Sequence, residues 1–152
     1  VVYGYALVPN GKTLNVGAGT KVHFHADSGI VVDKQGTLNV NGDELYKQVL
    51  ETSKTWKNSE NLMYVVGATK AEYFADIRKI VPDSFLLVPG IGAQGGSLSE
   101  VCKYGMNDKI GLLVNSARAI IYASKGTDFA EKAREEALSV QKEMENIINA
   151  KF

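Results

Sequence analysis

Two turns rich in glycine and small residues carry the groups of this sequence that are best suited to bind a ligand. The first turn, Pro89–Gly96, follows the apolar run Phe85–Val88, and the second, Asn115–Arg118, follows the apolar run Ile110–Val114. Exposed backbone N–H groups in such turns, together with a planar cation, bind phosphate groups. The sequence therefore predicts a phosphate site where the two turns meet. The predicted ligands are backbone N–H groups of the first turn, among them those of Gly95 and Gly96, and the guanidinium of Arg118.

Each turn also has a simpler interpretation. The glycine-rich turn could merely reverse the chain, and Arg118 could be a solvated surface cation. Four glycines lie within the seven residues Gly90–Gly96, which is more than a chain reversal requires, and glycine lets a ligand approach the backbone closely. Arg118 comes shortly after an apolar run, at the start of an expected helical turn, which favours an anion site. The residues themselves leave both interpretations open.

The composition is that of a globular protein without a strong charge bias. Apolar residues make up 45% and charged residues 22%, and 17 basic residues balance 17 acidic ones. We therefore expect neither nucleic acid nor a membrane as a partner. Cys102 is the only cysteine, which favours a reducing compartment and a cytoplasmic location. We expect no metal and no cofactor, because His23 and His25 lack a third ligand at a suitable spacing.

The two turns need a scaffold that brings them together, and residues 44–152 predict one. Three continuous apolar runs are typical of strands that are buried on both faces. They alternate with segments of helical periodicity, which implies a parallel sheet with right-handed crossovers. The predicted strands are Leu62–Val66, Phe85–Val88 and Ile110–Val114. The predicted helices are Glu44–Trp56, Lys70–Ile80, one that Ser97 caps with Glu100 and that ends near Gly105, and one from Thr127 or Asp128 to Asn149.

Residues 1–43 have a different sequence pattern, which predicts β-strands and turns throughout. The run Thr13–Val16 recurs as Thr37–Val40, a spacing of 24 residues, among short β-branched runs and turn residues. One coil of a β-solenoid needs a period of this size, and the segment resembles a piece of a right-handed parallel β-helix. A plain β-meander stays open as the alternative. The change of sequence pattern divides the chain into residues 1–43 and residues 44–152.

Three sequence motifs in the second part resemble those of a known family. They are Val65–Thr69, Leu87–Gly96 and Leu113–Ala123, and the Pro-Gly-Ile-Gly-Ala-Gln-Gly-Gly word is the most specific. The second part resembles the C-terminal half of orotidine 5′-monophosphate decarboxylase. The resemblance implies the last three strands of an eight-stranded barrel, with Gln94 and Arg118 on the phosphate of a nucleotide. We thus expect an α/β fold: a partial β/α barrel of three parallel strands and about four helices, preceded by the short all-β segment.

The catalytic array of that family is missing from this sequence. The resemblance implies catalysis by alternating Lys and Asp side chains in an Asp-x-Lys-x-x-Asp word, which none of the 152 residues forms. We therefore predict no catalytic residue and no decarboxylation by this chain alone. The expected function is weak binding of phosphate or a nucleoside monophosphate by a half-barrel fused to an unrelated β segment. The alternatives are a chimera without an evolved function and a lyase fragment that needs a complementing half.

An incomplete barrel also predicts something about assembly. Three strands cannot close into a barrel that requires eight. Such a sheet leaves two edges with unpaired N–H and C=O groups and one apolar face without cover. We therefore expect a homo-oligomer.

Overall fold

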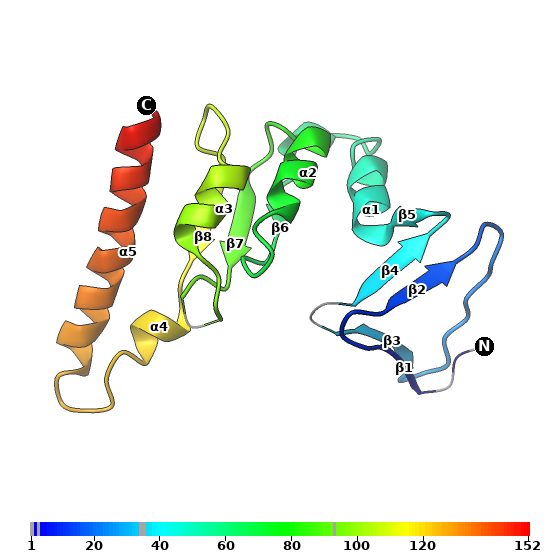
Figure 1. The fold of residues 1–152 in the computed structure, drawn as a ribbon, viewed down its shortest axis with the longest axis horizontal. Helices are drawn as coiled ribbons and strands as arrows, with labels where there is room; N and C mark the ends of the chain where they lie inside the picture. Colours follow the sequence, from blue (N-terminus) through cyan, green and yellow to red (C-terminus); the bar gives the residue numbers. More distant parts are fainter. Residues whose placement is uncertain (1, 3, 34–35, 93) are drawn as a thin grey trace. The chain divides into compact units, whose positions relative to one another are not determined.

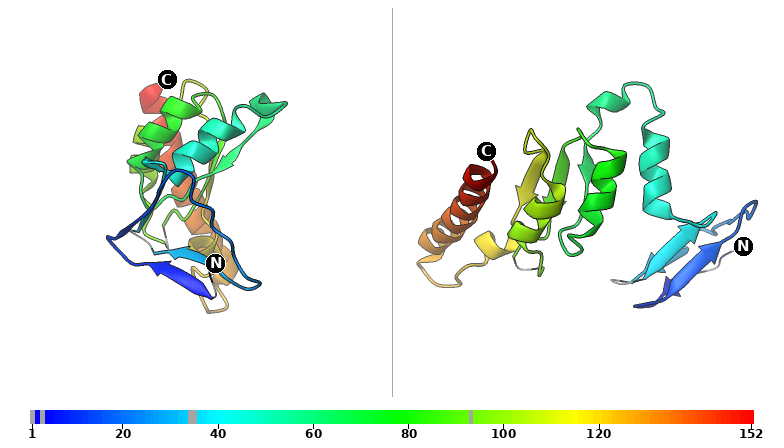
Figure 2. Two further views of the ribbon diagram at one scale, coloured as in Figure 1. Left: turned by 90° about the vertical axis from the view of Figure 1, so that its right-hand side faces the viewer. Right: turned by 45° about the horizontal axis from the view of Figure 1, so that its top comes forward.

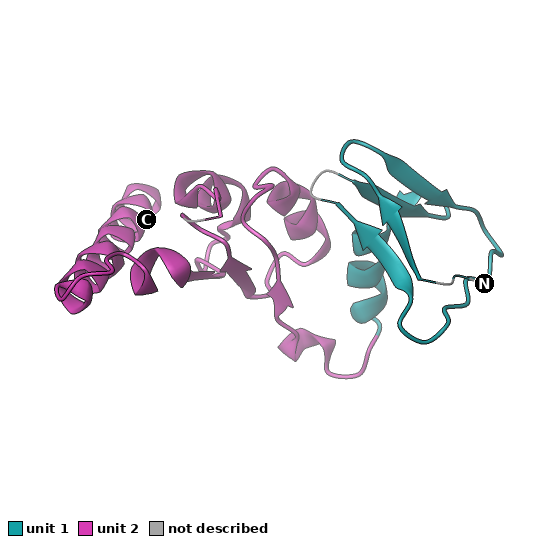
Figure 3. Cartoon of the chain, turned by 90° about the horizontal axis from the view of Figure 1, so that it is seen from below, with its two compact units in different colours: residues 1–55 teal, residues 56–152 magenta. Residues whose placement is uncertain are grey.

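The computed structural model describes residues 2, 4–33, 36–92 and 94–152. The chain divides into two compact units, Val1–Thr55 and Trp56–Phe152 (Figure 3). The described residues of the first unit form five short strands and one helix: β1 (Tyr5–Val8), β2 (Thr13–Val16), β3 (Gly29–Val32), β4 (Thr37–Val40), β5 (Asp43–Glu44) and α1 (Leu45–Ser53).

Parallel pairing joins the repeated runs of the first unit. β1 pairs with β3 from Tyr5↔Gly29, and β2 pairs with β4 from Thr13↔Thr37 (Figure 1). The two Thr-Leu-Asn-Val runs therefore lie side by side in register, and the amide of Asn39 donates to the Oδ1 atom of the equivalent Asn15 at 3.1 Å. A meander would pair successive strands antiparallel, so its pairing is not the one seen in β1–β4.

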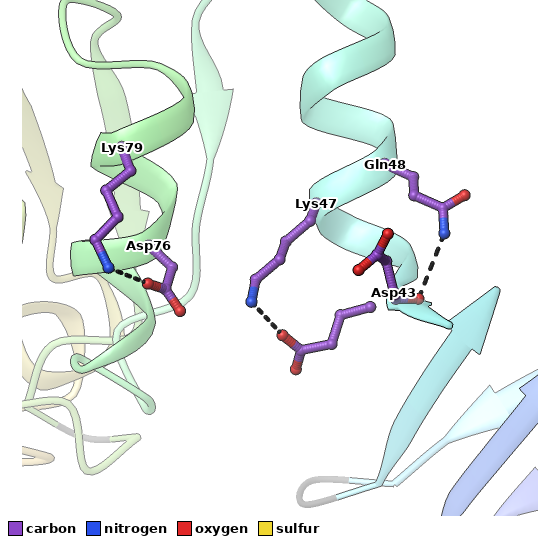
Figure 4. Close-up of polar contacts among 6 residues, drawn as sticks. Asp43, Lys47, Gln48, Asp76 and Lys79 are labelled. Carbon is purple, nitrogen blue, oxygen red and sulfur yellow. Dashed lines mark hydrogen bonds and ion pairs between the residues drawn. The ribbon is translucent and has the colours of Figure 1, made fainter. Parts of the chain in front are cut away.

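Helix α1 packs on β4 and β5. Its Gln48 side chain donates to the carbonyl oxygens of Val40 and Asp43. Figure 4 shows the contact of Gln48 with Asp43 and the ion pair of Lys47, whose Nζ atom lies 2.9 Å from the carboxylate of Glu44. By its contacts α1 thus belongs with the strands before it. The sequence pattern changes after residue 43, whereas the boundary between the two units lies after residue 55. The two positions differ because helix α1 packs in the β-rich unit.

The second unit is a parallel sheet with helices, as the alternating pattern predicts. The sheet order is β6-β7-β8, with Leu86 opposite Leu112 and Pro89 opposite Asn115. Five α-helices occur among the described residues of the whole chain, rather than about four, because a short helix follows β8. The elements of this unit are a 3₁₀ helix (Ser59–Asn61), β6 (Tyr64–Val65), α2 (Tyr73–Ile80), β7 (Leu86–Pro89), α3 (Leu98–Gly105), β8 (Leu112–Asn115), α4 (Arg118–Ile121) and α5 (Phe129–Lys151).

Helices α2 and α3 pack against each other, beside the sheet, in the core of this unit (Figure 2). Ser97 caps α3 as predicted, because its Oγ atom accepts from the backbone N–H of Glu100 at 3.3 Å. The strands are buried on one face, whereas the sequence predicted burial on both faces, and Leu113 remains 54% exposed. The buried residues of this core include Phe74, Ile77, Leu86, Val88, Val101, Cys102 and Leu112.

Candidate phosphate-binding site

The carboxyl ends of β7 and β8 lie side by side and bring the two predicted turns together. Pro89 pairs with Asn115 at the last position of the ladder, and parallel neighbours lie about 4.8 Å apart. A pocket of about 150 Å³ opens at this edge. It contains both side chains that the sequence singled out, Gln94 and Arg118. The lining residues are Pro89, Gly90, Ile91, Gln94, Asn115, Ala117 and Arg118.

Glycines give the first turn its shape. Gly90 has a φ of 99°, and a Cβ atom there would lie 2.8 Å from the Oε1 atom of Gln94. A Cβ atom on Gly96 would lie 2.4 Å from the Cβ atom of Ala68, just after β6, and 2.6 Å from the carbonyl oxygen of Gly90. Gly90 thus leaves room for the Gln94 side chain, and Gly96 lets the turn pack against its neighbours. Ala93, in the same turn, lies outside the described residues.

The N–H groups of Gly95 and Gly96 have partners within the turn. Gly95 donates to the carbonyl oxygen of Gly92 at 2.7 Å, and Gly96 donates to that of Gly90 at 3.1 Å. Neither residue lines the pocket. The structure therefore brings together Gln94 and Arg118, but not the two N–H groups that were expected beside them. The positive φ angles of Gly90, Gly92 and Gly95 fold the turn back on itself, and this directs the donors inward.

The side chains of Gln94 and Arg118 are available to a ligand. Within the part of the chain that the structure describes, neither side chain makes a hydrogen bond or an ion pair, and both are exposed. Arg118 is the charged residue of the pocket lining, and a guanidinium presents several N–H donors in a planar fork that matches phosphate oxygens. Glutamine adds an amide donor. The pocket thus combines positive charge with directed donors, as an anion site requires.

Asn115 and Ser116 are two polar residues that sequence reasoning did not assign. Asn115 lines the pocket that contains Gln94 and Arg118, and it also lines a second cavity of about 420 Å³, to which Ser116 contributes. The Oγ atom of Ser116 is buried without a hydrogen-bond partner among the described residues. A signal for both existed in the sequence, because polar residues that directly follow a buried parallel strand lie at the functional edge of such a sheet.

No group of three or more His, Cys, Asp or Glu side chains is placed to hold a metal ion in the described part of the chain. Among the same residues, no helix is long and apolar enough to cross a membrane. The remaining titratable group of note is the Cys102 thiol on α3, whose pKa is raised to about 11, first by burial and then by Glu143, with Lys151 acting in the opposite direction.

Curated proteins named orotidine 5′-phosphate decarboxylase match most of this chain. The protein of Flavobacterium johnsoniae is 92% identical over 116 residues, which are 76% of this chain and 42% of that protein. The protein of Christiangramia forsetii is 67% identical over 108 residues, which are 71% of this chain and 40% of that protein. The chain thus spans about two fifths of the length of these relatives. No protein-family model matches the chain.

Solved structures with similar folds carry related names. Leishmania donovani UMP synthase is 32% identical, with a TM-score of 0.56 over 76% of this chain and 28% of that one. Leishmania donovani OMP decarboxylase is 30% identical, with a TM-score of 0.58 over 80% of this chain and 48% of that one. About three quarters of this chain is therefore homologous to a part of proteins named orotidine 5′-phosphate decarboxylase, and its mixed α/β fold fits a partial barrel.

Proposed function

We propose that this chain binds the phosphate group of a nucleoside monophosphate in the pocket between the ends of β7 and β8. The observation that carries the proposal is that Gln94 and Arg118, both without a partner among the described residues, line one pocket of about 150 Å³. The names of the relatives support it, since orotidine 5′-phosphate and UMP are nucleoside monophosphates.

The affinity of this site rests mainly on the phosphate. The pocket is small and lies at an open sheet edge, so it does not enclose a sugar and a base. A single exposed arginine with one amide partner supports weak binding, of about millimolar affinity.

We expect the chain alone to bind without catalysing decarboxylation. The Asp-x-Lys-x-x-Asp word is absent from its sequence, and fixed charges of this kind supply most of the rate in such a site. Steady carbon dioxide release from orotidine 5′-monophosphate, with contaminating enzyme excluded, would contradict this. The β-rich unit has no role in the proposed site, which fits a half-barrel joined to an unrelated β segment.

Calorimetric titration with uridine 5′-monophosphate, and separately with uridine, tests the proposal. The expected result is weak binding of the monophosphate and no binding of the nucleoside. Arg118→Gln should weaken the binding about tenfold or more, whereas Arg134→Gln, which removes an exposed arginine on α5 outside the pocket lining, should leave it unchanged. Equal behaviour of the two variants, or no binding at all, would favour a chimera without an evolved function.

A further inference from the structure

The glycine-rich turn after β7 is held by three backbone hydrogen bonds of its own. Gly92 donates to the carbonyl oxygen of Gly96 at 3.1 Å, and Gly95 donates to that of Gly92 at 2.7 Å. Gly96 in turn donates to the carbonyl oxygen of Gly90 at 3.1 Å. These bonds join the first and last residues of the turn and restrict the backbone at Gly90. The side chain of Gln94 extends from this hydrogen-bonded turn into the pocket.

The carboxamide of Gln94 lies against the backbone of Gly90 with its oxygen inward. A Cβ atom on Gly90 would lie 2.8 Å from the Oε1 atom of Gln94, and 3.7 Å from both its Cβ and its Cδ atom. The Nε2 atom is not among these three nearest atoms, so the carboxamide turns its oxygen towards Gly90 and its nitrogen away. The nitrogen carries both donors of a glutamine side chain, and donors are what a phosphate oxygen requires.

Glycine is the residue that permits this arrangement at position 90. Its φ of 99° is one that residues with a side chain rarely adopt. A methyl group there would also lie closer to the Gln94 oxygen than van der Waals contact allows, so the carboxamide would have to move. An exposed glutamine that is already oriented loses less side-chain freedom when a ligand binds.

We infer that Gly90 is a positioning residue of the phosphate site, and this inference rests on the proposed function for its ligand. Gly90 acts through Gln94: it holds the amide oxygen against the backbone and thereby directs the amide N–H groups towards the anion. Arg118 supplies the charge of the site. The inward hydrogen bonds of the turn restrict Gly90, so the backbone N–H groups of Gly95 and Gly96 support the site without contacting the ligand.

The first test needs no phosphate and therefore stands apart from the proposed function. Relaxation of the side-chain amide resonances compares Gln94 with Gln141, an exposed glutamine on α5 outside the pocket lining. We expect the Gln94 amide to be restricted and the Gln141 amide to be mobile. In Gly90→Ala the Gln94 amide should become as mobile as that of Gln141. Gly95→Ala is the control, because it has a φ of 84° and a Cβ atom there meets nothing within 4 Å.

The second test couples the two residues through calorimetric titration with inorganic phosphate. Gly90→Ala and Gln94→Ala should each weaken binding about fivefold, the effect of one neutral hydrogen bond. The double variant should be no weaker than either single variant, because both changes remove the same contact. Gly95→Ala should keep the affinity of the unaltered chain. Both glycine variants place alanine at a positive φ, so their urea midpoints should fall alike, and a general loss of stability would weaken binding in both.

Three results would overturn the inference. One is a Gln94 amide as mobile as that of Gln141 in the unaltered chain, a result that decides the matter even where Gly90→Ala does not fold. Another is a double variant whose loss of affinity is the product of the two single losses. The third is an equal loss of affinity in Gly90→Ala and Gly95→Ala. An unaltered chain that binds no phosphate would instead overturn the proposed function, and the mobility of Gln94 would still decide whether Gly90 orders its side chain.

Discussion

Two arginines lie near opposite ends of the strands of the β6–β7–β8 sheet and differ in their hydrogen bonding. Near the edge where β7 and β8 begin, half-buried Arg78 of α2 donates to five carbonyl oxygens, and burial lowers its pKa while Asp83 raises it. Near the edge where the same strands end, Arg118 has no hydrogen-bond or ion-pair partner among the described residues. The acceptors of Arg78 are the carbonyl oxygens of Val81, Pro82, Ser84, Gly105 and Gly111, at 3.3, 3.2, 2.7, 2.6 and 2.9 Å.

The difference distinguishes an end of the strands where an arginine stabilises the fold from an end where an arginine stays available to the proposed ligand. Arg78 ties the end of α2, the end of α3 and the starts of β7 and β8 into one hydrogen-bonded cluster. Each of its three guanidinium nitrogens donates to the backbone, so the side chain is committed to the fold. Arg118 contributes no such bonds and keeps its donors. This division agrees with the general pattern of β/α barrels, in which the edge where strands begin serves stability and the edge where they end serves function.

The largest expected effect comes from breaking the stabilising edge. Arg78→Met keeps most of the side-chain volume but removes the guanidinium donor from five carbonyl oxygens, of which that of Gly111 keeps the N–H of Leu86 at 2.9 Å. We therefore expect the free energy of unfolding to fall by about 3 kcal/mol or more. Arg118→Met is the matched control and should change it by less than about 0.5 kcal/mol. Urea denaturation followed by circular dichroism measures both. Similar losses in the two variants would erase the distinction between the edges.

The second expected effect concerns the glycine-rich turn that follows β7. Gly96→Ala would place a methyl group 2.4 Å from the Cβ atom of Ala68, so we expect a loss of about 2 kcal/mol of stability together with loss of phosphate binding. Gly67→Ala is the control, because a Cβ atom there meets nothing within 4 Å. Thermal unfolding and phosphate titration report the two effects. An unaltered Gly96→Ala variant would show that the tight turn is not needed.

A third change separates the two ligand side chains from each other. We expect Arg118→Ala to weaken phosphate binding about tenfold or more and Gln94→Ala to weaken it less, since a charged hydrogen bond is worth about twice a neutral one. Neither variant should alter the urea midpoint. Calorimetric titration with phosphate measures the two affinities. A larger effect of Gln94→Ala would place the anion near the amide instead of the guanidinium.

The last expected effect is a pH dependence on the buried side of the sheet. The pKa of Cys102 rises from an ordinary 9.0 to about 11, so above pH 9.0 the unfolded chain loses a proton that the folded chain keeps. Its contribution to stability is complete below that pH and declines as the pH rises towards about 11. Cys102→Ala should therefore lose less stability than the unaltered chain between pH about 8 and pH about 10.5. The free energy of unfolding is measured by urea denaturation at several pH values. The same decline with pH in both proteins would contradict this.

Local signals predicted much of the scaffold and part of the site. Continuous apolar runs predicted the strands, the Ser97 and Glu100 pair predicted the start of α3, and the glycine-rich word predicted the position of Gln94. Each of these signals depends on neighbouring residues, and so it can be read from the chain directly.

Long-range geometry explains what could not be predicted. Arg78 reads as an ordinary helix surface residue, because its acceptors Gly105 and Gly111 lie 27 and 33 residues away. The inward hydrogen bonds of Gly95 and Gly96 depend on the φ angles of three glycines, which the sequence permits but does not fix. The burial of the strands on one face only could not be predicted, because the apolar sequence of a strand does not tell which of its faces other segments cover.

Amide resonances followed during titration with inorganic phosphate show whether Gln94 and Arg118 bind a phosphate group together. If the pocket between the ends of β7 and β8 binds phosphate, the signals of Gln94 and Asn115 and the side-chain Nε–H signal of Arg118 will shift together along one saturating curve. Signals around Arg78, at the opposite edge, will stay in place. Shifts that spread over exposed lysines while Gln94 and Arg118 remain unmoved would contradict the account.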